Sequence, residues 1–180
     1  MTQLHEDAMG EVVSTARLRL RPLLQADAER INACVRDPRI YRNVGRIASD
    51  QTLEDTRAFI ARNAQNWTEG RNYGFGILNV DDLIGVVGGS PLDDGLAMDV
   101  GYWIAPDSWG RGFATEAFRA YVDWLAWAKG VRGVTAGHFT DNPASGRVLS
   151  KCGFLRCGRS RYYCLGRDEW VDCIDMARIV

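Results

Sequence analysis

The spacing of apolar and polar residues predicts alternating strands and helices along most of the chain. Between residues 17 and 21, three arginines alternate with Leu18 and Leu20, a period of two that is typical of a half-buried strand. From Phe113 to Ala128 the apolar residues instead recur with the helical period, and Gly130 is a natural terminator for that helix. The chain therefore combines both types of element.

The same patterns predict the remaining elements and an α/β (α+β) fold. The strand–helix–strand unit at residues 97–140 should be a parallel, right-handed crossover within a mostly antiparallel sheet of about seven strands with flanking helices. Residues 1–13 lack a pattern and are expected to be a flexible lead-in to a single domain at residues 14–180. Further helices are expected at 27–37, 52–66 and after Asn142, and strands at 73–80, 83–89, 96–104, 131–140, 156–165 and 170–179.

Composition and charge exclude several classes of protein. The 180 residues are 46% hydrophobic, enough for one substantial core, and the net charge of −1 provides no global basic field to attract nucleic acid. No apolar run is long enough to span a membrane, and the N-terminus lacks a secretory signal. Five cysteines without metal-ligand spacing indicate reduced thiols in the cytoplasm and no metal site.

The segment from Ala105 to Thr115 carries the most chemical information. Gly110 and Gly112 allow a ligand to approach the backbone, and the segment leads into a helix N-terminus, which favours an anion such as a phosphate. A tight turn without a ligand is the alternative. The chain has no Gly-Lys pair, which excludes a Walker A loop, and Thr115 together with the absence of a later acidic residue argues against a dinucleotide fingerprint.

Two segments resemble signatures of the GCN5-related N-acetyltransferase (GNAT) family. Trp109-Gly110-Arg111-Gly112-Phe113-Ala114 is similar to the family's acetyl-CoA motif, and Asn142-Pro143-Ala144-Ser145 with the following helix is similar to its second signature. The resemblance covers nearly the whole chain and is closest to the ribosomal-protein N-terminal acetyltransferase branch. Trp109 departs from the family pattern, because glutamine or arginine usually stands there, and Asp99 stands where many relatives have glutamate.

The resemblance implies a site between two diverging strands, 97–104 and 131–140. The pantetheine arm of acetyl-CoA would pair with the backbone there, and the backbone N–H of Trp103 or of Ile104 would polarise the thioester carbonyl. Asn142 would hold the arm or only cap the helix, and Ser145 would contact the arm or the departing sulfur. The implied cofactor-binding residues are Trp103, Ile104, Gly110, Arg111, Gly112, Phe113, Ala114, Thr115, Asn142 and Ser145.

Three residues are the candidate catalytic groups for direct acetyl transfer to a primary amine. Asp99 would take a proton through water, while Ser145 or Tyr162 would serve the departing thiolate. His138 and Tyr163 are alternatives that also fit structural roles.

The acceptor, a protein N-terminus or a small-molecule amine, should bind near loop 42–46 and the turn after Leu165. Trp67, Tyr73 and Trp170 would line that site or pack in the core.

Two other functions remain open from the sequence. A non-catalytic CoA-binding sensor or interaction domain would keep the fold and the cofactor site. An RNA-associated protein would use a basic strip on the last strands, formed by Arg156, Arg159, Arg161 and Arg167. A homodimer is plausible only by analogy with the family.

Overall fold

The structure is a computed structural model that describes residues 3–7, 10–92 and 95–180, with the backbone alone for residues 3–7 and 10. Its strands form one mixed sheet in the order β1-β2-β3-β4-β5-β6-β7-β9-β8. The strands are β1 (Gln3–Asp7), β2 (Gly10–Ser14), β3 (Arg19–Pro22), β4 (Phe75–Asn79), β5 (Asp82–Pro91), β6 (Ala97–Ile104), β7 (Gly133–Phe139), β8 (Leu155–Cys164) and β9 (Glu169–Ile179). The helices are η1 (Gln25–Asp27), α1 (Ala28–Val35), α2 (Pro38–Tyr41), α3 (Leu53–Thr68), η2 (Pro106–Ser108), α4 (Phe113–Lys129) and α5 (Pro143–Lys151).

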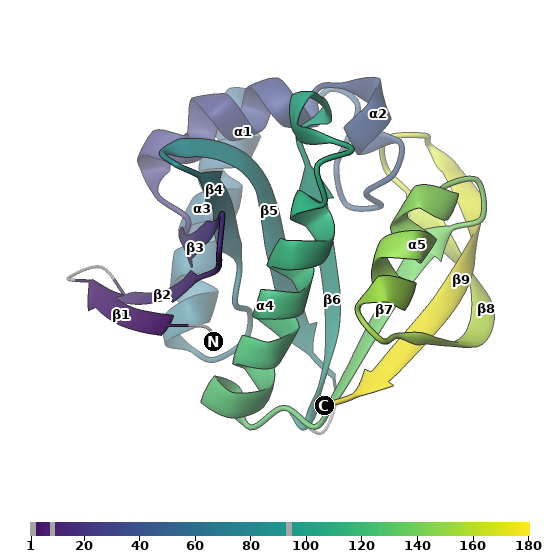
Figure 1. The fold of residues 1–180 in the computed structure, drawn as a ribbon. Coiled ribbons are helices and arrows are strands. Elements are labelled where there is room, and N and C mark those ends of the chain that lie inside the picture. The colour runs from purple at the N-terminus through teal and green to yellow at the C-terminus, as the bar shows by residue number, and fades with distance from the viewer. Residues whose placement is uncertain (1–2, 8–9, 93–94) are drawn as a thin grey trace.

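The topology confirms the α+β fold class and the crossover. Strands β6 and β7 pair in parallel, whereas every other pairing in the described sheet is antiparallel. Helix α4 connects β6 and β7, and it lies with α5 on one face of the sheet, while α1 and α3 lie on the other (Figure 1). The ends of two helices are as predicted: Gly130 has a left-handed φ of 68°, and the Asn142 side chain caps α5.

The N-terminal segment differs from the prediction. Residues 1–13 were expected to be an irregular lead-in, but β1 and β2 form a hairpin that joins the sheet at β3, so the described sheet has nine strands where about seven were predicted. Residues 1, 2, 8 and 9 of that stretch lie outside the described residues. Val12 and Val13 are buried, and the Glu11 carboxylate accepts a hydrogen bond from the Trp124 indole at 2.9 Å. The contacts of Glu11, Val12 and Val13 with the core therefore hold β2 in place.

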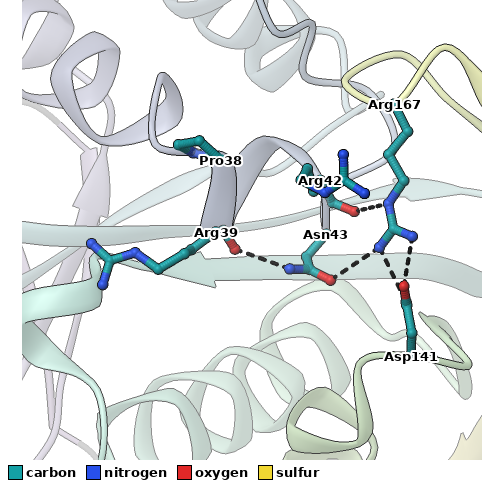
Figure 2. Close-up of a pocket in the computed structure, with 6 residues that line it drawn as sticks. All are labelled: Pro38, Arg39, Arg42, Asn43, Asp141 and Arg167. Atoms are coloured by element: carbon teal, nitrogen blue, oxygen red, sulfur yellow. Dashed lines mark hydrogen bonds and ion pairs between the residues drawn. The ribbon is translucent and has the colours of Figure 1, made fainter.

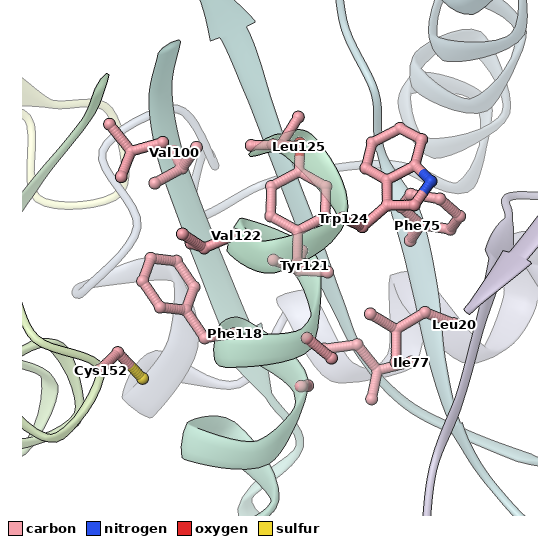
Figure 3. Packing of buried hydrophobic residues seen from close by; sticks show 14 of the residues in the cluster. Leu20, Phe75, Ile77, Val100, Phe118, Tyr121, Val122, Trp124, Leu125 and Cys152 are labelled. Atoms are coloured by element: carbon pink, nitrogen blue, oxygen red, sulfur yellow. The ribbon is translucent and has the colours of Figure 1, made fainter. Parts of the chain in front are cut away.

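Two apolar layers cover the two faces of the sheet. The larger layer lies under α4 and contains fully buried aromatic residues such as Phe118, Tyr121 and Trp124 (Figure 3). The smaller layer packs α1 and α3 against β5 and β6 and includes Trp103. These layers fix β6 from both sides, so the functional groups that β6 carries have rigid positions.

Candidate active site

Strands β6 and β7 pair only over the first part of their length. The register ends at the pair Asp99 and Thr135, although β6 continues to Ile104 and β7 to Phe139. The two strands therefore diverge beyond this pair and leave a gap between their C-terminal halves (Figure 1). This geometry confirms the divergence that the family resemblance implied.

Backbone groups of Ile104 face this gap. The Ala105 N–H donates to the Ile84 carbonyl at 2.7 Å, which makes that opposing pair a hydrogen-bonded one. Bonded and non-bonded pairs alternate in an antiparallel ladder, so Trp103 bonds to β5, whereas the N–H and C=O of Ile104 point away from β5. The Ile104 carbonyl accepts a hydrogen bond from the Trp109 indole at 2.6 Å. Of the two residues considered from the sequence, Ile104 thus presents its N–H to the gap.

The loop after β6 presents a row of unpaired donors. Gly110 and Gly112 have φ values of 74° and 79°, which residues with a Cβ atom rarely adopt. The first backbone donor of α4 with a partner is Glu116, which donates to the Gly112 carbonyl at 3.1 Å. Within the described residues, no acceptor bonds the N–H groups of residues 110 to 115. Six consecutive free donors at a helix N-terminus suit a diphosphate.

A charged clasp holds this loop against the N-terminal part of the chain. Arg17 forms an ion pair with Glu116 at 2.6 Å and donates to the Arg111 carbonyl at 2.9 Å. Thr15 also donates to the Glu116 carboxylate, at 2.6 Å. Arg17 and Arg111 lie over the ring of the buried Phe113. The first turn of α4 is therefore fixed by contacts distant in the sequence.

On the α4 side of the gap, Tyr102 meets the start of α5. Its hydroxyl donates to the Ser145 hydroxyl at 3.2 Å, and burial raises the pKa of Tyr102 to about 12. Asn142 accepts a hydrogen bond from the Ser145 N–H at 3.2 Å, so the capping role is confirmed. The sequence analysis did not select Tyr102. Tyr102 lies two residues from Val100 and two from Ile104, so all three share one face of β6. This spacing was the sequence signal that could have identified Tyr102.

Asp99 lies on the opposite face of β6. It accepts a hydrogen bond from Thr135 at 3.1 Å. Although Asp99 is exposed, partial desolvation by the surrounding protein raises the pKa of its carboxyl, and the Thr135 hydrogen bond and the nearby Arg46 only partly oppose this. Arg46 donates to the Tyr162 hydroxyl at 3.2 Å. Asp99, Arg46 and Tyr162 therefore gather on one side of the sheet, whereas Ser145 lies on the other.

Other candidate residues take structural positions. His138 lies beneath α5, where a Cβ at Gly146 would stand 2.6 Å from its Nε2, and its Nδ1 lies 2.9 Å from the Phe139 carbonyl. Tyr163 donates to Asp168. Trp67 and Tyr73 pack in the core beside Trp124, so they do not line an acceptor site. Trp170 is 58% exposed and contacts Tyr163.

The loop expected to bind the acceptor does meet the β8–β9 turn. The Leu165 N–H donates to the Gly45 carbonyl at 2.9 Å, and Arg167 donates to the Arg42 carbonyl at 2.6 Å. Beside these contacts lies a hollow of about 290 Å³ (Figure 2). Its lining residues are Pro38, Arg39, Arg42, Asn43, Asp141 and Arg167.

The structure changes the picture of the other functional classes. Arg167 is only 6% exposed and is paired with Asp141, so it cannot belong to a solvent-facing basic strip, and Arg161 is paired with Asp172. In residues 3–7, 10–92 and 95–180, no group of three His, Cys, Asp or Glu residues is arranged to hold a metal ion. No helix in the same ranges is long and apolar enough to cross a membrane.

Residues 17–155 match the acetyltransferase (GNAT) domain family. The chain belongs to this family. An uncharacterized N-acetyltransferase of Bacillus subtilis, YoaA, is 34% identical over 86% of this chain and 89% of its own length. The ribosomal-protein-serine acetyltransferase of Escherichia coli is 28% identical over 72% of this chain and 73% of its own length. By family, this acetyltransferase is an acyl-CoA-dependent N-acetyltransferase.

Solved structures agree on the fold of the acetyltransferase. RimL, a ribosomal L7/L12 alpha-N-protein acetyltransferase solved in complex with coenzyme A, superposes with a TM-score of 0.85 at 18% identity, covering 94% of this chain and 98% of its own. The microcin C7 self-immunity acetyltransferase MccE, solved with acetyl-CoA and AMP, gives a TM-score of 0.81 at 16% identity over 92% of this chain and 94% of its own.

Proposed function

We propose that the acetyltransferase moves the acetyl group of acetyl-CoA directly to a primary amine, on a protein N-terminus or a small molecule. The observation that carries this proposal is the two-sided geometry of β6. The Ile104 N–H faces the gap, with Tyr102 and Ser145 on one face of the strand and Asp99 on the other. Such an arrangement lets two substrates reach one strand from opposite faces.

The free donors of the loop would hold the cofactor. The N–H groups of residues 110 to 115 fit a diphosphate, because a helix N-terminus offers hydrogen bonds and a favourable dipole. Trp109 uses its indole N–H on the Ile104 carbonyl, so the phosphate contacts here would come from the backbone. Asn142 and Ser145 at the start of α5 would contact the pantetheine arm, and the Ile104 N–H would polarise the thioester carbonyl.

Proton transfer would use one group on each face of the sheet. Asp99 would take a proton from the acceptor ammonium through water, and its raised pKa makes it a better base than an ordinary aspartate. Ser145, which accepts a hydrogen bond from Tyr102, would pass a proton to the departing thiolate and take in its place the proton that the new amide nitrogen loses. Tyr162 lies on the Asp99 side of the sheet beside Arg46, which favours contact with the acceptor over a role at the thiolate.

A thiol-release assay with acetyl-CoA and a panel of amines and N-terminal peptides tests the activity. Asp99→Asn should lower kcat/KM by about 10²-fold or more, the scale of general-base catalysis, and should remove the acidic limb of its pH profile. Acetyl-CoA binding should stay within about twofold of wild type, since Asp99 faces away from α4 and α5. A protein that binds acetyl-CoA saturably but releases no thiol with any acceptor would instead be a CoA-binding sensor domain.

Gly112→Asp tests the cofactor site, because a carboxylate there would repel phosphate and a side chain would strain the φ of 79°. The matched control is Gly95→Asp, which imposes comparable strain at a φ of 68° with no atom of the described residues within 4 Å of the new Cβ. Calorimetry should show acetyl-CoA affinity lost in the first variant and kept in the second. Unchanged affinity in Gly112→Asp would overturn the assignment of the loop.

A further inference from the structure

More basic than acidic side chains line the hollow described above. Three guanidinium groups and one carboxylate line it, those of Arg39, Arg42, Arg167 and Asp141, which gives a formal net charge of +2. Its remaining lining residues, Pro38 and Asn43, are uncharged. A small anionic group would therefore find a favourable field in this hollow.

Most of these charges already have partners. Arg167 donates to both carboxylate oxygens of Asp141, at 2.7 and 3.1 Å, and its side chain is only 6% exposed (Figure 2). This hydrogen bonding lowers the pKa of the Asp141 carboxyl, with a further contribution from Arg42. Arg39 is paired with Asp37 at 2.7 Å and lies over the Trp109 ring. Arg167 and Arg39 thus build the walls of the hollow.

Arg42 differs from its neighbours. Its backbone carbonyl accepts the hydrogen bond of Arg167, but among the described residues no side chain or carbonyl bonds its guanidinium. The residue is exposed and lines the hollow. A guanidinium in this position can bind a carboxylate through two parallel hydrogen bonds.

The hollow lies at the open end of the gap. Asp141 follows the end of β7 by two residues, and Arg39 lies over Trp109, whose indole bonds the last carbonyl of β6. The loop that carries Arg42 continues to Arg46, which lies near Asp99. A group in the hollow would therefore be a close neighbour of an amine placed at the end of the gap.

We propose that this hollow selects acceptors that carry a carboxylate close to the reacting amine, with Arg42 as the group that recognises it. The inference rests on the proposed function, because it names the acceptor class of that same site. The coenzyme has a separate set of donors at residues 110 to 115, so its diphosphate does not require the hollow. The carboxylate can belong to an acidic side chain near a peptide N-terminus or to a free amino acid.

Calorimetry on the CoA-loaded protein tests the proposal without turnover. The probes are Ser-Glu-Glu amide against Ser-Gln-Gln amide, and free serine against serinamide, so that the two sources of the carboxylate are distinguished. We expect at least one acidic member to bind about tenfold more tightly than its neutral partner, as one partly screened charge-assisted hydrogen bond would give. Arg42→Gln should abolish the preference, and Arg42→Lys should keep part of it. Arg36→Gln, at an exposed position outside the hollow, is the matched control and should leave the preference unchanged.

Each outcome decides the proposal. Equal binding of acidic and neutral probes, no binding of any probe, or a preference that survives Arg42→Gln would overturn it. An equal loss of CoA affinity in Arg42→Gln would also overturn it and assign the hollow to the coenzyme. The thiol-release assay separates the two levels. Acetylation without an acidic preference refutes the hollow alone, whereas a preference without any acetylation refutes the proposed function.

Discussion

Replacing Glu116 by glutamine should loosen the loop at residues 110–115, which we propose binds the cofactor, and should measurably lower the free energy of unfolding. The carboxylate accepts hydrogen bonds from Thr15, from the Arg17 backbone and from the Arg17 guanidinium. A glutamine oxygen can keep the first two, but its NH₂ group would face the guanidinium donors. One charge-assisted hydrogen bond and the ion pair with Arg17 are therefore lost.

The magnitude follows from the exposure of the pair. A hydrogen bond to a charged group contributes about 1.5–3 kcal/mol when shielded from water. The Arg17 side chain is 47% exposed, however, so solvent screening reduces the contribution. We expect Glu116→Gln to lower the free energy of unfolding by about 1.5 kcal/mol in urea denaturation. Acetyl-CoA affinity should fall about three- to tenfold, because the Arg111 carbonyl loses a fixed anchor.

The effect of Glu116→Gln should also depend on pH. Burial raises the pKa of the Glu116 carboxyl, but the hydrogen bonds from Thr15 and Arg17 outweigh burial and hold the pKa below its ordinary value. A lowered folded-state pKa stabilises the protein above the unfolded pKa of about 4.3, and this contribution is lost as the pH falls through the folded value. The difference between wild type and variant should thus be full at neutral pH and shrink in acid.

Asp81→Asn is the control, because its ion pair with Arg19 is 3.5 Å long and the Asp81 side chain is 90% exposed. It should change stability by less than about 0.5 kcal/mol. A Glu116→Gln variant as stable as this control, with unchanged acetyl-CoA affinity, would refute the role assigned to the clasp.

Three further outcomes are expected. Asp27→Ala should cost about 3 kcal/mol in urea denaturation, because it leaves Arg21, which now donates to both Asp27 oxygens at 2.8 Å, partly buried without its charge partner; a loss below about 1 kcal/mol would contradict this. Phe118→Ala should cost about 3–5 kcal/mol, since Phe118 is fully buried under α4, and the conservative Phe118→Leu should lose clearly less. In native protein, a thiol reagent should modify the exposed Cys157 far faster than Cys173, because burial and two nearby aspartates raise the pKa of Cys173 to about 11. Equal labelling rates of the two cysteines in the native protein would exclude this account.

The fold was largely predictable because local chemistry marks its element ends. Thr52 caps α3 together with Asp55, and Asn142 caps α5, as their positions before each helix indicated. One exception was the β1–β2 hairpin. Its contact with α4, between Glu11 and Trp124, joins segments distant in sequence, and no local period reveals it.

The candidate site was predictable where the backbone provides the chemistry. Gly110 and Gly112, selected because they let a ligand approach the backbone, have the left-handed conformation that glycine adopts readily. Side-chain partners were less predictable, because Tyr102 with Ser145 and Arg46 with Tyr162 meet only in the folded sheet. The distribution of Asp99 and Ser145 over opposite faces likewise depends on the strand register, which composition does not determine.

The alternation of side chains along β6 separates the groups that we propose for the two substrates of the acetyltransferase. Even-numbered positions such as Tyr102 contact the elements that would bind coenzyme, and odd-numbered positions such as Asp99 face the side where the amine would arrive. Substitutions at Asp99 and in loop 42–46 can therefore change the choice of acceptor, while the elements proposed to bind coenzyme stay unchanged.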